Sequence, residues 1–143
     1  MADIALDAAK IAVVDPEKAW IDTYVAGVTI TAGQFLYGII ASGKVGLADE
    51  DASLEASNVV GMALEAGVAG QAISVLKKGK VYGFTLSGHA YWLRCSLSAT
   101  AGAILDTGAV TNVVARVVPL SDADLTKVLE VDCVLGTMPG ASS

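Results

Sequence analysis

Glycine is the residue that most limits what this chain can fold into. The sequence has 15 glycines, and many of them separate short apolar runs, as in Ala41-Ser42-Gly43-Lys44 and Ser87-Gly88-His89. Glycine weakens helix interiors and readily takes the positive φ of tight turns. Closely spaced turns between short apolar runs are typical of β-sandwiches and β-barrels. The sequence therefore predicts a mainly all-β fold, a small β-barrel or β-sandwich with one or two short helical turns.

Strands are expected where apolar and β-branched residues alternate or run together between these turns. The clearest is residues 20–25, which place Ile21, Thr23 and Val25 on one face. The other expected strands cover residues 28–31, 34–40, 45–48, 59–64, 71–76, 81–86, 90–97, 103–105, 110–118 and 127–135. Short helical turns are expected within residues 49–58 and 121–127, the second because a good N-cap and early acidic residues follow Pro119.

A small-Ala-Gly unit occurs three times, in residues 31–36, 68–73 and 100–105, and each copy leads into an expected strand. Its glycines, Gly33, Gly70 and Gly102, suit the positive-φ position of a β-turn. Their unequal spacing does not make a solenoid. The pattern instead indicates that one β unit is reused along the chain.

The chain of 143 residues is long enough for one domain with a buried core, and 54% of it is apolar. We expect a single β domain over residues 16–135, an N-terminal arm or first strand over residues 1–15, and a flexible tail over residues 136–143. The net charge of -6 disfavours general binding to nucleic acid or to anionic membranes.

No membrane or export segment is expected. Acidic Asp3 and Asp7 stand where a signal peptide has basic residues. The uncharged stretch 23–43 is long enough to span a bilayer, but its glycines and threonines favour two strands and a turn.

Catalytic and metal-binding groups are sparse, and the chain is not expected to be an enzyme or to hold a cofactor. The sole histidine, His89, is expected as an exposed turn residue. An enzyme would need His89, or the pair Asp49 and Asp51, in a closed pocket. Asp122 and Asp124 form a second acidic pair, and both pairs lie in polar connectors where carboxylates are normally solvated. Asp49, Asp51 and Glu55 could loosely hold calcium but lack the EF-hand pattern. Cys95 and Cys133 are expected as two free, buried thiols, and no metal site is predicted.

The candidate interface contacts are aromatic and basic side chains. Trp20 and Trp92 are candidate anchors, with Tyr24 beside the first, because exposed aromatic residues often dominate interface energies. Lys77, Lys78 and Lys80 form the one basic cluster. They are expected at a hairpin tip, where they could contact an acidic partner surface.

Several motifs together resemble the capsid decoration (cement) proteins of tailed bacteriophages. The resemblance covers about residues 25–118. It rests on segments that reproduce that family's β-meander: residues 31–37, Gly46-Leu47-Ala48, Gly61-Met62-Ala63, Ala66 to Gln71, Gly79-Lys80-Val81, Gly88 to Tyr91 and Ala101-Gly102. The chain departs from the family pattern at Ala115 to Asp122, where a second Gly-x-Ala strand is often found.

The resemblance implies a non-enzymatic, mainly β protein that is often trimeric. Such a protein is made in the host cytoplasm and binds the major capsid protein on the outer surface of the virion head, where it stabilises the expanded shell. Three alternatives remain open from the residues: another small virion part such as a tail or head-fibre base, a ligand-binding or carrier β-barrel module with a modified lysine among Lys77, Lys78 and Lys80, and an enzyme.

Overall fold

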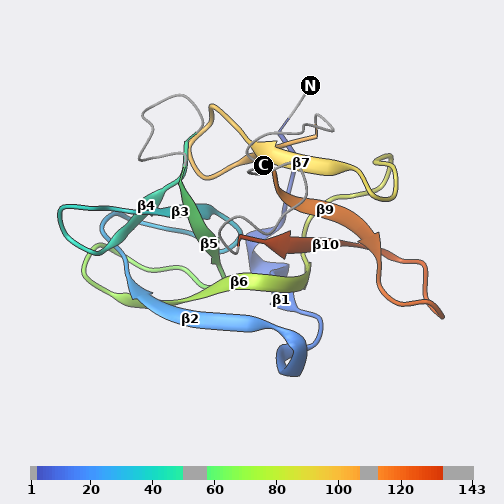
Figure 1. Cartoon of the computed structure of the whole chain (residues 1–143), viewed down its shortest axis with the longest axis horizontal. Helices are drawn as coiled ribbons and strands as arrows, with labels where there is room; N and C mark the ends of the chain where they lie inside the picture. The colour runs from blue at the N-terminus through green and yellow to red at the C-terminus, as the bar shows by residue number, and fades with distance from the viewer. Residues whose placement is uncertain (1–2, 50–57, 107–112, 134–143) are drawn as a thin grey trace.

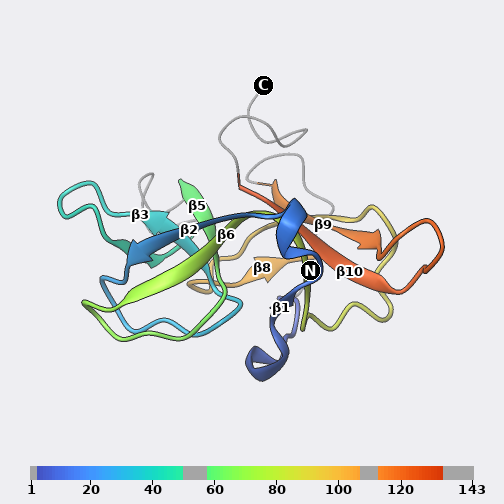
Figure 2. The same cartoon turned by 90° about the horizontal axis from the view of Figure 1, so that it is seen from below.

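The computed structural model describes residues 3–49, 58–106 and 113–133. Within them, ten strands form one curled antiparallel sheet, a half-barrel (Figures 1 and 2). The strands are β1 (Ala12–Val13), β2 (Trp20–Val25), β3 (Phe35–Gly38), β4 (Val45–Leu47), β5 (Val59–Ala63), β6 (Ala72–Tyr82), β7 (Arg94–Leu97), β8 (Ile104–Leu105), β9 (Val113–Pro119) and β10 (Lys127–Asp132). Their order is β4-β3-β5-β6-β10-β9-β7-β8, and β1 and β2 also pair with β6. The predicted all-β fold class is confirmed.

The course of β6 differs most from the sequence-based prediction, which was wrong here. Separate strands were expected over residues 71–76 and 81–86, with the lysines at a hairpin tip between them, but one strand runs through the whole region. Across the expected tip, Lys78, Gly79 and Lys80 pair with residues of β10. A turn there would give up these ladder hydrogen bonds. Long-range pairing therefore overrides the local turn signal.

Three strands of the sheet are buried on both faces. Neighbouring residues on a strand point to opposite sides, and on β3, β5 and β6 such neighbours belong to two different cores. The larger core takes Phe35, Met62 and Leu76 from these strands, together with much of β7, β9 and β10. The smaller core takes their neighbours, which are Leu36, Ala63 and Val75. These strands thus form the wall between the two cores.

The repeated Ala-Gly unit forms the expected turns. Gly33, Gly70 and Gly102 have φ of 92°, 91° and 81°, and each turn closes with a backbone hydrogen bond between its first and fourth residues. In the first two copies the glutamine after the glycine accepts a hydrogen bond from the first residue: Gln34 Oε1 from Thr31 N at 2.9 Å, and Gln71 Oε1 from Val68 N at 3.1 Å.

The first two copies are also related by a local two-fold arrangement. Ile30 and Gly67 exchange two backbone hydrogen bonds, of 2.8 and 2.9 Å. On either side, Gly33 N donates to Ala63 O at 2.8 Å, and Gly70 N donates to Ala26 O at 2.7 Å. The corresponding residues, which are Ile30 and Gly67, Gly33 and Gly70, and Ala26 and Ala63, are all separated by the same number of positions in the sequence. The β unit that the sequence repeats is thus used twice around one axis.

Other local predictions need correction. Residues 28–31 form only an isolated bridge at Ile30, and residues 90–93 precede β7 as a turn rather than opening a strand. No helical turn forms at 121–127. The Ser121 hydroxyl instead accepts from the amides of Ala123 and Asp124, at 3.3 and 3.1 Å. Such side-chain bonds compete with helix formation.

The two helical turns of the described residues lie near the N-terminus. They are 3-10 turns, η1 (Ala8–Lys10) and η2 (Pro16–Lys18), capped by the carboxylates of Asp7 and Asp15. The helical turn expected at 49–58 falls almost wholly outside the described residues, as does the expected tail, 136–143. No helix in the described part of the chain has the length and apolar character needed to cross a membrane.

Most of the expected N-terminal segment, residues 1–15, lies along the sheet. β1 pairs with the end of β6. Asp3 and Leu6 form isolated bridges to Leu105 and Phe84. Asp3, Leu6 and β1 therefore contact segments that are distant in the sequence.

Gly61 tests the close contact between β5 and β6. A Cβ at Gly61 would overlap Val75 Cγ1 and approach the Leu76 carbonyl oxygen to 2.8 Å. We expect Gly61→Ala to lower the free energy of unfolding by about 1–3 kcal/mol, because overpacking forces the strands apart. Gly38→Ala on the paired strand β3 is the control, since its nearest contact is an ordinary 3.6 Å. Urea unfolding measures both, and equal stability of the two variants would contradict the packing account.

Candidate interaction surfaces

Within the described part of the chain, the candidate catalytic residues do not form a recognisable catalytic centre. His89 was expected to be exposed, but it is half-buried, and its Nδ1 lies 3.6 Å from Asp106 Oδ2. The expectation that His89 is exposed was therefore wrong, because the side chain is partly covered and lies beside the Asp106 carboxylate. Ser87 is exposed. No cluster of three or more potential metal ligands occurs in residues 3–49, 58–106 and 113–133.

The described acidic candidates do not line the groove beside Lys78 and Lys80 that is described below. Asp122 and Asp124 are exposed. Hydrogen bonds from the Thr126 hydroxyl and amide lower the pKa of Asp124, so this carboxylate acts as a turn cap. Asp49 is half-buried, whereas Asp51 and Glu55 lie outside the described residues.

Both cysteines are free and buried, as predicted. Desolvation by burial raises the pKa of Cys95 from 9.0 to about 12, with a further contribution from the Asp106 carboxylate. Burial also raises the pKa of Cys133, again as the largest cause. A thiol that stays protonated at neutral pH is a poor nucleophile. Both side chains therefore serve as core packing.

Three of the predicted contact residues gather at β2. Trp20, Asp22 and Tyr24 alternate along the strand, and Lys77 of β6 reaches across them. The Lys77 ammonium lies 5.0 Å from the Trp20 ring centroid and 5.7 Å from that of Tyr24, and it donates to the Tyr24 hydroxyl at 3.1 Å. We call these four residues the β2 cluster.

Asp22 ties the β2 cluster together. Its Oδ2 accepts from Trp20 Nε1 at 3.2 Å and lies 3.9 Å from the Lys77 ammonium. Trp20 is nonetheless 47% exposed. The strand pattern predicted the alternation, but the contribution of Lys77 was missed because the lysines were placed in a turn.

Trp92 belongs to a second cluster, at the β9–β10 hairpin. This hairpin and the chain leading into β7 lie together at the right of Figures 1 and 2, away from β3 and β4. Trp92 is 58% exposed, and the Arg116 guanidinium lies 5.5 Å from its ring centroid. Arg116 is itself held by two hydrogen bonds to Glu130 Oε1, of 3.0 and 2.8 Å.

Tyr91 completes this surface. Its hydroxyl donates to the Leu125 carbonyl, and the Lys127 ammonium lies 5.0 Å from its ring centroid. Lys127 also donates to the His89 carbonyl. Exposed Tyr91, Trp92 and Leu125 thus stand on two loops that are tied to each other. We call these three residues, with Arg116 and Lys127, the Trp92 cluster.

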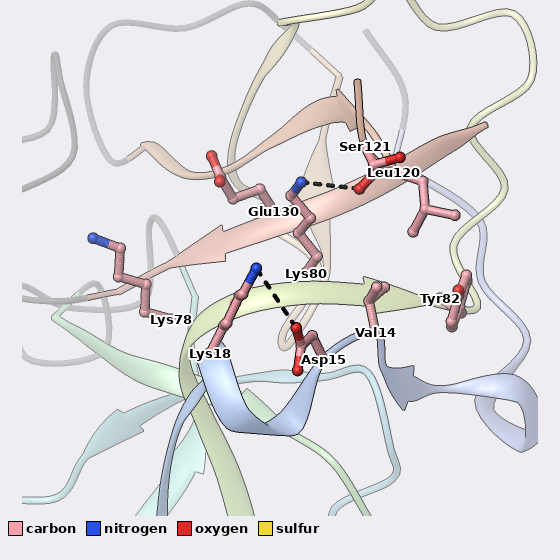
Figure 3. A pocket seen from close by; sticks show the side chains of 10 residues that line it. Val14, Asp15, Lys18, Lys78, Lys80, Tyr82, Leu120, Ser121 and Glu130 are labelled. Carbon is pink, nitrogen blue, oxygen red and sulfur yellow. Dashed lines mark hydrogen bonds and ion pairs between the residues drawn. The ribbon is translucent and has the colours of Figure 1, made fainter. Parts of the chain in front are cut away.

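The remaining candidate lysines line a groove on the other side of β6 (Figure 3). Its volume is about 500 Å³. The lining residues come from the β1–η2 segment, β6, the β9–β10 loop and β10: Val14, Asp15, Lys18, Lys78, Gly79, Lys80, Tyr82, Leu120, Ser121 and Glu130. Lys80 donates to the carbonyls of Pro119 and Leu120, at 3.4 and 3.1 Å. Sequence reasoning missed Lys18, whose place here depends on the fold alone.

Comparisons of the chain with models of known protein families, with curated proteins and with solved structures found no match.

Alkaline pH tests the burial of the two thiols. Above pH 9.0 the unfolded chain releases thiol protons that the folded chain keeps up to about pH 12 at Cys95. Unfolding is therefore favoured as pH rises, by about 1.4 kcal/mol per pH unit for each thiol. We expect a Cys95→Ala/Cys133→Ala variant to lose stability less steeply between these values, measured by urea unfolding. Because the two proteins share every ionisable group except these thiols, equal slopes would contradict the assigned burial.

Proposed function

We propose that this chain is a non-enzymatic structural protein that decorates the outer surface of a bacteriophage head and stabilises the expanded shell. Its partner is the major capsid protein, and it acts as a homo-oligomer, with a trimer favoured. The resemblance of residues 25–118 to capsid decoration proteins supports this proposal. The observation that carries it further is the conformation of Trp92.

Trp92 has φ of 66° and is the one non-glycine residue with positive φ among the described residues. This conformation costs an L residue about 1–2 kcal/mol, and glycine would avoid that cost. Backbone strain of this kind is concentrated at functional sites. The indole is mostly exposed, so core packing does not account for it. A large, exposed and strained aromatic residue is well suited to anchor a protein interface.

The surroundings of Trp92 keep the anchor rigid. Its amide donates to the Val117 carbonyl at 2.6 Å, and Arg116 and Lys127 pack against the rings of Trp92 and Tyr91. Side chains that are already ordered lose less entropy on binding. The β2 cluster offers a second, separate anchor in Trp20. Two anchors on different parts of one molecule suit a protein that bridges neighbouring subunits.

The other functional classes have less support. A carrier module with a modified lysine was based on a hairpin tip, but Lys77, Lys78 and Lys80 lie within a paired strand. An enzyme would need His89, or the pair Asp49 and Asp51, in a closed pocket. Neither His89 nor Asp49 lines the groove beside Lys78 and Lys80, and Asp51 lies outside the described residues. No observation favours a tail or head-fibre base over a head surface.

Cosedimentation with phage heads tests the proposal. The purified protein is expected to bind expanded heads of the phage that encodes it and not the unexpanded procapsid. Equal binding to both particles, or to neither, would overturn the proposal.

Substitution of Trp92 tests the anchor. Trp92→Gly removes the backbone strain, so thermal stability should be unchanged or higher, whereas head binding should weaken by about tenfold or more, as for an interface hot spot. Val68→Ala is the control, because Val68 is similarly exposed, at 60%, and belongs to neither cluster. Unaltered head binding by Trp92→Gly would show that Trp92 is not the anchor.

A further inference from the structure

We propose that the groove above β6 binds an extended, acidic peptide segment of a partner protein. This inference does not depend on the phage-head proposal, because it rests on the shape and charge of the groove alone. Figure 3 shows its three lysines on two elements: Lys18 comes from η2, while Lys78 and Lys80 come from β6.

The groove lies between two walls with β6 beneath. The β1–η2 segment forms one wall and contributes Val14, Asp15 and Lys18. The β9–β10 loop forms the other wall with Leu120 and Ser121. Lys80 fixes this second wall, because its ammonium donates to two carbonyls there. The opening between the walls is therefore held by hydrogen bonds before any ligand arrives.

The acidic side chains of the groove are already engaged. Asp15 Oδ1 accepts the Glu17 amide at 3.2 Å, where it caps η2. Glu130 Oε1 accepts both hydrogen bonds from Arg116. Asp15 also forms an ion pair with Lys18, with 3.9 Å between Asp15 Oδ2 and the Lys18 ammonium. The groove therefore sets three lysines against two carboxylates.

The lysines, by contrast, retain hydrogen-bonding capacity. An ammonium has three N–H donors. Lys80 uses two of them. Lys18 and Lys78 lie 3.9 Å from Asp15 and Asp132, too far for a hydrogen bond, and their side chains are 86% and 57% exposed. The groove thus presents unused N–H donors and, with three lysines against two lining carboxylates, an excess of one positive charge on a chain with a net charge of -6.

The walls favour a peptide over a small free anion. Val14, Tyr82 and Leu120 contribute apolar surface beside the lysines, and a volume of about 500 Å³ is many times that of inorganic phosphate. An extended segment presents successive side chains on opposite sides. Acidic side chains of such a segment would reach the lysines while its apolar atoms cover the walls.

The chain offers a closely matched pair of variants for the test. Lys10 and Lys18 each end a 3-10 turn, and each pairs with the aspartate that caps its turn, at 4.0 and 3.9 Å. Both lysines are largely exposed, at 77% and 86%. Lys18 lines the groove, whereas Lys10 does not. Lys18→Glu and Lys10→Glu therefore change the net charge equally and differ in their relation to the groove.

The experiment measures binding of a labelled oligoglutamate peptide to the full chain by fluorescence anisotropy at about 0.15 M salt, where the Debye length is about 8 Å. We expect Lys18→Glu to raise Kd about tenfold. Lys10→Glu should raise it less than about twofold, because Lys10 does not line the groove and exposed charges are screened at this salt concentration. Lys78→Gln is a second variant and should also raise Kd. Thermal unfolding checks that each variant is folded. Amide NMR signals of Gly79 and Lys80 should shift on addition of the peptide.

Several outcomes would overturn the proposal. Equal loss of binding in the Lys10 and Lys18 variants would mean that net charge alone attracts the peptide. Inorganic phosphate that displaces the peptide at comparable concentrations would indicate a small-anion site. Absence of binding by the unaltered chain would exclude the acidic segment as the occupant. None of these results bears on binding to phage heads by Trp92.

Discussion

The hydrogen bonds of β6 hold the two halves of the sheet together. Its first half lies between β2 and β5, and its second half pairs with β1 and β10. The strand therefore belongs to both halves, and it contributes side chains to both cores. Gly79 stands near the change of partners with φ of 150°, a backbone conformation that side-chain-bearing residues rarely adopt. Ala19 packs against the place where a Gly79 Cβ would lie.

This arrangement also divides the basic cluster between two surfaces. Neighbouring residues of a strand point to opposite sides. Lys77 consequently reaches the rings of the β2 cluster, whereas Lys78 and Lys80 line the groove. One short lysine run thus supplies a half-buried contact with aromatic rings and two groove contacts. A hairpin tip would have presented all three lysines to solvent without this separation.

The sequence alone predicted the features that depend on residues close together along the chain. The alternation of residues 20–25, the Ala-Gly turns and the burial of both cysteines were predicted, because periodicity and glycine placement report local geometry. It did not predict the features that depend on contacts between segments distant in the sequence. The path of β6 depends on pairing with β10, and the place of Lys18 depends on how η2 lies against β6. Trp92 was a candidate anchor by residue type, but its strained backbone could not be read from the residues.

The cations of this chain are concentrated where its surface offers contacts. The sequence has nine lysines and arginines, and most of them lie in the two aromatic clusters or the groove: Lys77, Arg116, Lys127, Lys18, Lys78 and Lys80. A cation that rests on an aromatic ring keeps part of its electrostatic stabilisation when water is removed. Its side chain has also lost much of its rotamer freedom before binding. The two aromatic clusters are therefore suited to burial in a protein interface. The lysines of the groove are less constrained and are suited to binding a charged ligand in place of water.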